Sequence, residues 1–227
     1  MTKIAFNIEK IQQNIKKHSP YPEKVKIIAV TKNRSKEEVA QAIQSGIRCI
    51  GENRVQEAKQ KLLFLSHEAK RSKIKKHFIG HLQSNKIHDA ITLFDMIESV
   101  DSLRLGEKID RDAQKSGKIM EILIQVNIAL DETKYGCHPK DVKEILLNLS
   151  KRKNIQVRGL MTIGKRTQNS EETAETFKKF YKLFATIKSL EIPGIKMEEL
   201  SMGMSNDYII ALQEGATMIR LGRAIFV

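Results

Sequence analysis

The chain has 227 residues, of which 41% are hydrophobic and 30% are charged, and its formal net charge is +13 at pH 7. This balance is typical of a folded globular protein and excludes a disordered chain. The length fits one barrel-sized domain, so we expect a single domain over residues 1–227. Basic residues are scattered and aromatic residues make up only 5%. We therefore expect no specific nucleic-acid partner.

The cysteines and the start of the chain indicate the cellular setting. Cys49 and Cys137 are far apart and form no CxxC motif, so neither a disulfide framework nor a zinc site is expected, and no ligand motif indicates another metal. Residues 1–18 carry a charge every few positions, which leaves no apolar segment for a signal peptide or a membrane span. We expect a cytoplasmic protein without a membrane partner.

Two amphipathic helices are the clearest helical predictions. The first lies within residues 1–20 and should pack on the rest of the fold, because its isoleucines recur every three or four positions: Ile4, Ile8, Ile11 and Ile15. The second begins near Asn169 and places a stripe of apolar side chains on one face: Ala174, Phe177, Phe180, Tyr181, Phe184 and Ile187. This spacing is typical of a helix that packs against a sheet.

Eight short apolar runs alternate with helix-like stretches along the chain. Strands that are apolar on both faces, each followed by a helix, are typical of a parallel sheet covered by helices. Eight such units favour closure, so we predict an α/β fold, a single-domain (β/α)8 TIM-type barrel with an extra N-terminal helix. The predicted strands are residues 26–32, 48–53, 76–81, 96–100, 121–128, 156–164, 197–203 and 218–226.

The first predicted strand, KIIAVTK, delivers Lys32 to the carboxyl end of the barrel, where the chemistry of this fold gathers. Partial desolvation at the mouth of an apolar strand disfavours an ammonium group and leaves an amine that can attack a carbonyl. Lys32 is therefore a candidate for a Schiff base. The alternative is an ordinary strand-end lysine whose charge reaches water. Other polar residues at predicted strand ends are Glu52, Asn53, His81 and Asn127.

The last two strands indicate a phosphate site. GMSND (203–207) places Ser205 before an amphipathic segment, where it can cap a helix whose N–H groups face an anion or serve as a cap alone. The turn Gly222-Arg223 can supply further backbone donors, and the loops after strands seven and eight often hold phosphate in this fold. Together with Lys32 these residues suit a phosphorylated aldehyde, and pyridoxal 5'-phosphate (PLP) has that chemistry.

Six stretches of the sequence, in order over most of the chain, resemble the pyridoxal phosphate homeostasis protein family, which is related to the barrel domain of bacterial alanine racemase. The stretches are AVTK (29–32), GENRVQE (51–57), HFIGHLQSNK (77–86), NIALDETKYG (127–136), RGLMTIG (158–164) and LSMGMSNDYIIALQEGATMIRLGRAIF (200–226). The resemblance implies that Lys32 carries PLP as a Schiff base and that Asn53 lines the pocket beside it.

The resemblance also assigns contacts with PLP to residues at the ends of the last two strands: Met204, Ser205, Arg220, Gly222 and Arg223. Met204 and Arg223 are implied to bind the phosphate mainly through backbone N–H groups, and Arg220 to lie near the ring nitrogen or the phosphate. The family usually has a small hydroxylated residue where Arg223 stands. We therefore expect one phosphate contact to differ in this chain.

The function implied by the resemblance is intracellular PLP homeostasis, in which PLP is held as a Schiff base and buffered or delivered to apo-enzymes. Related racemases take a second base from an additional C-terminal domain and a partner subunit, and we expect neither here. An arginine near the ring nitrogen also weakens the electron sink that racemisation needs. We therefore expect a monomeric carrier without efficient turnover. The alternative is a PLP-dependent amino-acid racemase or related enzyme, with His81 as acid or base.

Overall fold

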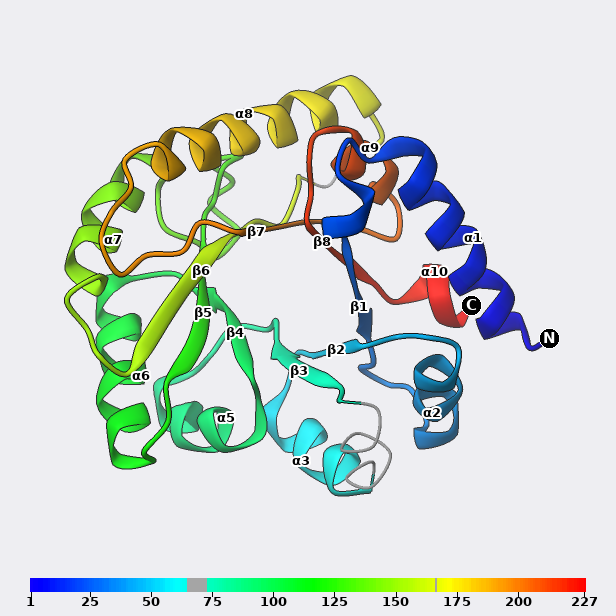
Figure 1. The fold of residues 1–227 in the computed structure, drawn as a ribbon, viewed down its shortest axis with the longest axis horizontal. Helices are drawn as coiled ribbons and strands as arrows, with labels where there is room; N and C mark the ends of the chain where they lie inside the picture. The colour runs from blue at the N-terminus through cyan, green and yellow to red at the C-terminus, as the bar shows by residue number, and fades with distance from the viewer. Residues whose placement is uncertain (65–72, 166) are drawn as a thin grey trace.

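The computed structural model describes residues 1–64, 73–165 and 167–227, which form a closed α/β barrel (Figure 1). Within these residues, eight parallel strands pair in chain order, and β8 pairs with β1 to close the sheet. The predicted TIM-type fold is confirmed. The strands are Lys26–Val30 (β1), Cys49–Glu52 (β2), Lys75–Phe78 (β3), Met96–Val100 (β4), Met120–Gln125 (β5), Ile155–Met161 (β6), Glu199–Met204 (β7) and Met218–Leu221 (β8).

Helices surround the barrel on its outside (Figure 1). Short 3-10 turns cover Pro22–Lys24 (η1), Ser84–Lys86 (η2) and Pro139–Asp141 (η3). The described α-helices are Lys3–His18 (α1), Lys36–Gln44 (α2), Val55–Phe64 (α3), Ile87–Leu93 (α5), Leu103–Lys115 (α6), Val142–Leu149 (α7), Ser170–Lys188 (α8), Tyr208–Gln213 (α9) and Arg223–Phe226 (α10).

Helix α1 packs against α2, α9 and α10, so the predicted N-terminal helix covers the seam where the barrel closes (Figure 1). Two amide side chains fasten it there. Asn7 Nδ2 donates to the carbonyl of Ile225 at 3.0 Å, and Asn14 Nδ2 donates to the hydroxyl of Tyr208 at 2.7 Å. The isoleucines that predicted the helix are all buried: Ile4, Ile8, Ile11 and Ile15.

The core has two parts because successive residues of a strand face opposite sides of the sheet. A large cluster lies between the strands and the helices and includes the predicted aromatic stripe of α8, with Phe177 and Phe180 fully buried. A smaller cluster draws one side chain from each of six strands: Ile28, Cys49, Met96, Leu123, Met161 and Met218. The barrel interior is therefore filled, and a ligand site has to lie at its rim.

The first and last strands end earlier at the carboxyl rim than the sequence predicted. The first was expected to reach Lys32, but β1 ends at Val30; the last was expected to reach Phe226, but β8 ends at Leu221. Gly222 is the N-cap of α10, and the pairing of β1 with β8 ends at Ala29 and Leu221, so the ladder cannot continue. Apolar composition alone does not reveal this break. Lys32 and the Gly222-Arg223 turn consequently lie in loops at the same rim.

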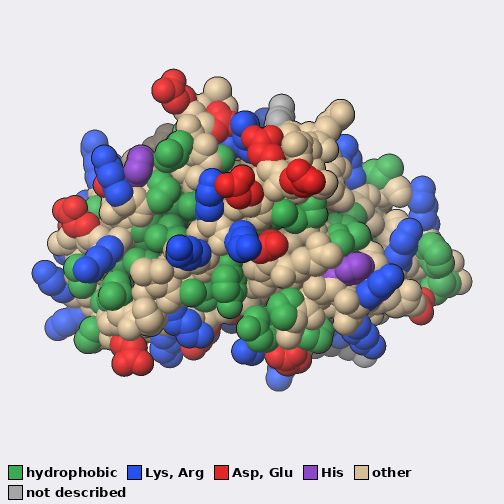
Figure 2. Space-filling view, turned by 90° about the horizontal axis from the view of Figure 1, so that it is seen from above, with side chains coloured by type: hydrophobic (Ala, Val, Ile, Leu, Met, Phe, Trp, Pro, Cys, Tyr) green, Lys and Arg blue, Asp and Glu red, His purple; other side chains and the backbone are tan. Residues whose placement is uncertain are grey.

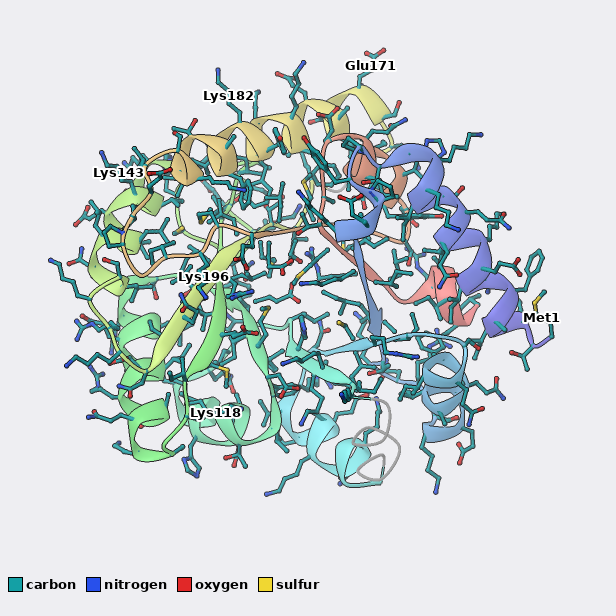
Figure 3. All side chains as sticks on the ribbon, in the orientation of Figure 1. Met1, Lys118, Lys143, Glu171, Lys182 and Lys196 are labelled. Carbon is teal, nitrogen blue, oxygen red and sulfur yellow. The ribbon has the colours of Figure 1, made fainter. Side chains whose placement is uncertain are left out.

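Lysine and arginine side chains are interleaved with aspartate and glutamate over the face seen in Figure 2. Lys143 on α7 and Lys182 on α8, for example, are exposed on the outer faces of their helices (Figure 3). Much of the basic charge is therefore solvated on separate elements. Among the helices of the described residues, none has both the length and the apolar character to span a bilayer.

Candidate functional site

A cavity of about 630 Å³ opens at the carboxyl rim between the end of β1 and the ends of β6, β7 and β8. Lys32 is part of its wall, in the turn two residues after β1. The side chain is exposed, so the expected desolvation by the barrel mouth is wrong. Because β1 ends at Val30, the turn carries the lysine out of the apolar layer. Other lining residues include Gly164, Lys165, Asn169, Ser170 and Thr173.

The opposite wall contains the predicted phosphate residues. The cavity is lined there by Met204, Ser205, Arg220, Gly222 and Arg223. Six of the seven predicted site residues therefore meet in one cavity, although they come from both ends of the chain. This follows from the topology, since β1 and β8 are hydrogen-bonded neighbours.

Ser205 links the two loops that were predicted to bind phosphate, instead of capping the helix that follows it. Its Oγ accepts a hydrogen bond from the N–H of Ala224, in the first turn of α10, at 3.1 Å. The following helix, α9, begins at Tyr208 with Asp207 at its N-cap position. The N–H of Met204 donates to Asp207 Oδ1 at 2.5 Å, so this predicted phosphate donor is already engaged. The side chain of Arg223 donates to Asn206 Oδ1 at 3.1 Å.

Arg220 is 4% exposed and forms the floor of the cavity. Its guanidinium donates to Ser201 Oγ and to the carbonyl of Thr162, each at 2.7 Å. Ser201 Oγ in turn donates to Glu98 Oε2 at 2.6 Å, and the other oxygen of Glu98 lies 2.7 Å from His77 Nδ1. A hydrogen-bonded chain thus crosses the barrel interior from β8 to β3.

The electrostatics of this chain follow from its burial. Burial lowers the pKa of Arg220, although the nearby carboxylates of Glu98 and Asp207 oppose that shift. For His77, burial alone favours the neutral ring, but hydrogen bonds with Cys49 and Glu98 outweigh it and raise the pKa to about 10. Burial likewise opposes the charge of Glu98, and His77 and Arg220 outweigh it, so the pKa of Glu98 is lowered.

Of this network, only Arg220 was predicted from the sequence; Ser201, Glu98 and His77 were not. The available signal was the glutamate in the mostly apolar strand MIESV, because a glutamate that is buried needs hydrogen-bonding or charged partners. His77 lies on β3 and Glu98 on the neighbouring strand β4, and both side chains face the barrel interior.

Asn53, the seventh predicted residue, lies elsewhere. It lines a second rim cavity of about 460 Å³ together with His81, and Lys32 is not among the described residues of that lining. The buried Oδ1 of Asn53 has no hydrogen-bond partner among the described residues. His81 stacks on Tyr135, with ring centroids 3.9 Å apart. The acid or base suggested for a racemase is therefore outside the Lys32 cavity.

Asn127 and Cys137 both lie in the loop that follows β5. Asn127 Nδ2 donates to the carbonyl of Asp131 at 2.8 Å, and Asn127 thereby shapes its own loop. Cys137 is buried, and burial raises the pKa of its thiol to about 12. Its backbone pairs with Val126 after β5, which draws the loop inward.

The chemistry of the Lys32 cavity fits a small phosphorylated aldehyde. Its volume lies within the range of small-molecule sites, roughly 300–1,000 Å³. An exposed primary amine stands on one wall, and a serine hydroxyl with the backbone turn at Gly222 stands on the other. Arg220 and Arg223 add positive charge suited to an anion. The fold and this rim site define the class: a parallel (β/α)8 barrel whose functional groups gather where its first and last strands meet.

The chain matches the family of the alanine racemase N-terminal domain over residues 2–227. The pyridoxal phosphate homeostasis protein of Pasteurella multocida is 33% identical over 227 residues, which cover 98% of this chain and 96% of the relative. The protein of that name from a Synechocystis strain is 38% identical over 205 residues, 90% of this chain and 92% of the relative. The chain belongs to the pyridoxal phosphate homeostasis protein family.

Solved structures agree with this assignment. PipY of Synechococcus elongatus, solved with PLP bound, is 36% identical, with a TM-score of 0.88 over 99% of this chain and all of that chain. An alanine racemase of Clostridium difficile is 18% identical, with a TM-score of 0.74 over 98% of this chain and 56% of that one. The second likeness concerns the barrel fold alone.

Proposed function

We propose that this protein binds PLP in the Lys32 cavity, holds it as a Schiff base and takes part in intracellular PLP homeostasis. The observation that carries the proposal is the convergence of Lys32 with the β7 and β8 loops on one cavity. PipY, a relative of nearly the same length, has PLP bound, and several relatives are named for PLP homeostasis. PLP supplies an aldehyde that condenses with a lysine amine and a phosphate that anchors the molecule.

Each wall of the cavity has a separate task. Lys32 would hold the aldehyde end of PLP through its Nζ, because a primary amine and an aldehyde condense with the loss of one water. Ser205 and the backbone turn Gly222-Arg223 bind the phosphate, and the guanidinium of Arg223 adds a charge that the usual small residue lacks. Met204 contributes the position of its loop, because its N–H is held by Asp207.

Arg220 makes the site suited to holding PLP more than to turning it over. Its donors are fixed by Ser201 and Thr162, so a guanidinium charge stays at the cavity floor. A cation beside a pyridine nitrogen disfavours protonation of that nitrogen, which weakens carbanion chemistry. We therefore propose a carrier that buffers PLP or passes it to apo-enzymes, acting as a monomeric, single-domain cytoplasmic protein over residues 1–227. Asn53 follows β2, the strand paired with β1, so the proposal keeps it beside Lys32 although it lines the second rim cavity.

The test is covalent capture of PLP. Purified protein mixed with PLP should show the visible absorbance of a Schiff base, and borohydride reduction should leave one PLP-sized mass on the peptide that contains Lys32. Lys32→Ala should lose both signals. The matched control is Lys165→Ala, because Lys165 lines the same cavity and forms an ion pair with Glu172. An adduct that survives in Lys32→Ala and disappears in Lys165→Ala would overturn the proposal.

A further inference from the structure

A buried ion pair lies behind the loop that carries Lys32. Lys61 on α3 places its Nζ 2.7 Å from Glu52 Oε1 at the end of β2. The side chains are only 9% and 1% exposed. Neither residue lines the Lys32 cavity, so the pair is separate from the surface that would contact PLP. Glu52 Oε2 is buried with no hydrogen-bond partner among the described residues, so this carboxylate is held through Oε1 alone and depends on its partners there.

The pair holds the residue before Lys32 through both its backbone and its side chain. Lys61 Nζ donates to the carbonyl of Thr31 at 2.5 Å, and Thr31 Oγ1 donates to Glu52 Oε1 at 2.5 Å. Hydrogen bonds that involve a charged group are stronger than neutral ones. The backbone therefore enters the Lys32 turn from a fixed point.

The residue after Lys32 is held from the same helix. The N–H of Asn33 donates to Glu57 Oε1 at 2.7 Å, and Glu57 lies 3.4 Å from Lys61 Nζ. Asn33 has φ +56°, a left-handed conformation that asparagine adopts more readily than most residues. Partial burial opposes the charge of Glu57, but the Asn33 N–H and Lys61 outweigh it and lower the pKa of this carboxyl group. Glu57 thus remains a charged acceptor at neutral pH.

We infer that Lys61 is a positioning residue for Lys32: through Thr31, Glu52 and Glu57 it fixes the turn from which the reactive amine projects. This inference rests on the proposed function. Lys32 is exposed and its four-carbon side chain is flexible. A mobile backbone would therefore lower still further the fraction of conformers in which Nζ reaches the aldehyde. Docking of the phosphate depends on the opposite wall. Lys61 should therefore affect formation of the C=N bond and leave phosphate binding unchanged.

The experiment compares two ligands on Lys61→Met. PLP reports the covalent step through its visible absorbance, and 4-deoxypyridoxine 5'-phosphate, which lacks the aldehyde, reports docking by calorimetry. We expect the Schiff-base equilibrium constant to fall roughly tenfold, the factor expected when a charge-assisted hydrogen bond is lost. Affinity for the deoxy analogue should stay within about twofold. Lys59→Met is the matched control, because Lys59 is exposed on the same helix, and it should change neither value.

A second variant covers the case in which Lys61→Met does not fold, since it leaves Glu52 buried without its partner. Glu57→Ala removes a side chain that is 28% exposed; it releases Asn33 and one partner of Lys61, while the buried pair of Lys61 with Glu52 remains. It should lower the Schiff-base constant by roughly threefold, again without changing the affinity for the deoxy analogue. Urea unfolding in the absence of PLP establishes that each variant is folded.

The outcomes separate the inference from the function on which it rests. Equal losses for both ligands, or unchanged Schiff-base constants in folded Lys61→Met and Glu57→Ala, overturn the positioning role alone. Wild-type protein that binds the deoxy analogue but forms no Schiff base with PLP overturns the proposed function, and the positioning role with it.

Discussion

At the scale of single residues, two buried cations share one carboxylate beneath the Lys32 cavity. Glu98 accepts from Ser201 on one oxygen and contacts His77 on the other, while Arg220 reaches it through Ser201. Burying an unpaired charge costs far more free energy than burying a paired one. The chain of hydrogen bonds explains how a glutamate is accommodated in the interior of the barrel, and it keeps a net positive charge under the site.

His77 makes this arrangement sensitive to pH. Its pKa of about 10 in the folded protein is above the ordinary value of 6.5, so the stabilisation from the charged ring is complete below about pH 6.5 and is lost as pH rises toward 10. His77→Gln should lower the free energy of unfolding at pH 6 by about 3 kcal/mol, the cost of breaking a buried pair. The difference from wild type should shrink at pH 9. Urea unfolding at both values measures it.

The control for this prediction is His88→Gln, because His88 is exposed. That change should have little effect at either pH. A loss in His77→Gln that is the same at pH 6 and pH 9 would show that the ring is neutral and acts only through packing.

At the scale of elements, periodicity predicted the interiors of strands and helices, but not where they end. The isoleucines of α1 and the aromatic residues of α8 were sufficient because burial of one face dominates a long helix. The ends of β1 and β8 depend on which residues pair across the closing seam, which is a tertiary property. For the same reason Lys32 and Ser205 could be predicted as candidates from their positions after strands, whereas Lys61 could not, because its partners Glu52 and Thr31 are 9 and 30 residues away.

The end of β7 shows how close packing positions the loop that is proposed to bind phosphate. Gly203 has φ +89°, and a Cβ there would lie 2.5 Å from Ala211 Cβ and 3.1 Å from Tyr208 Cα. We predict that Gly203→Ala pushes α9 away, weakens PLP binding and lowers the free energy of unfolding by about 2–4 kcal/mol. Urea unfolding and PLP titration measure the two effects.

Gly117→Ala is the matched control, because Gly117 also has a positive φ (+59°) but nothing lies within 4 Å of the added Cβ. It should cost about 1 kcal/mol from backbone strain and leave PLP binding unchanged. If the two substitutions lowered the free energy of unfolding equally, the close approach of α9 to Gly203 would not contribute to the cost of Gly203→Ala.

At the scale of the whole molecule, the formal charge of +13 creates a field that attracts anions even though the individual lysines are dispersed. Arg220 and Arg223, which are part of this charge, line the cavity itself. A dianionic phosphate ester should therefore approach faster than an uncharged analogue, and salt should remove the advantage as the screening length falls from about 30 Å at 10 mM to about 3 Å at 1 M.

The corresponding measurement is stopped-flow association of PLP at 10 mM and 500 mM sodium chloride. We expect the association rate to fall roughly threefold or more at the higher concentration. Pyridoxal, which has the same aldehyde without the phosphate, is the control and should associate at a rate that salt barely alters. Identical salt dependence for the two compounds would contradict a role for the field.

The pairing of β1 with β8 gives the cavity an unusual dependence on the completion of the chain. Lys32 emerges early from a ribosome, whereas Ser205 and the Gly222-Arg223 turn emerge about 170 to 190 residues later, and only ring closure brings them together. A ligand that contacts both sides bridges the β1–β8 pairing, which is the last to form, and its binding free energy stabilises that pairing. Capture of the ligand thus records that the barrel has closed.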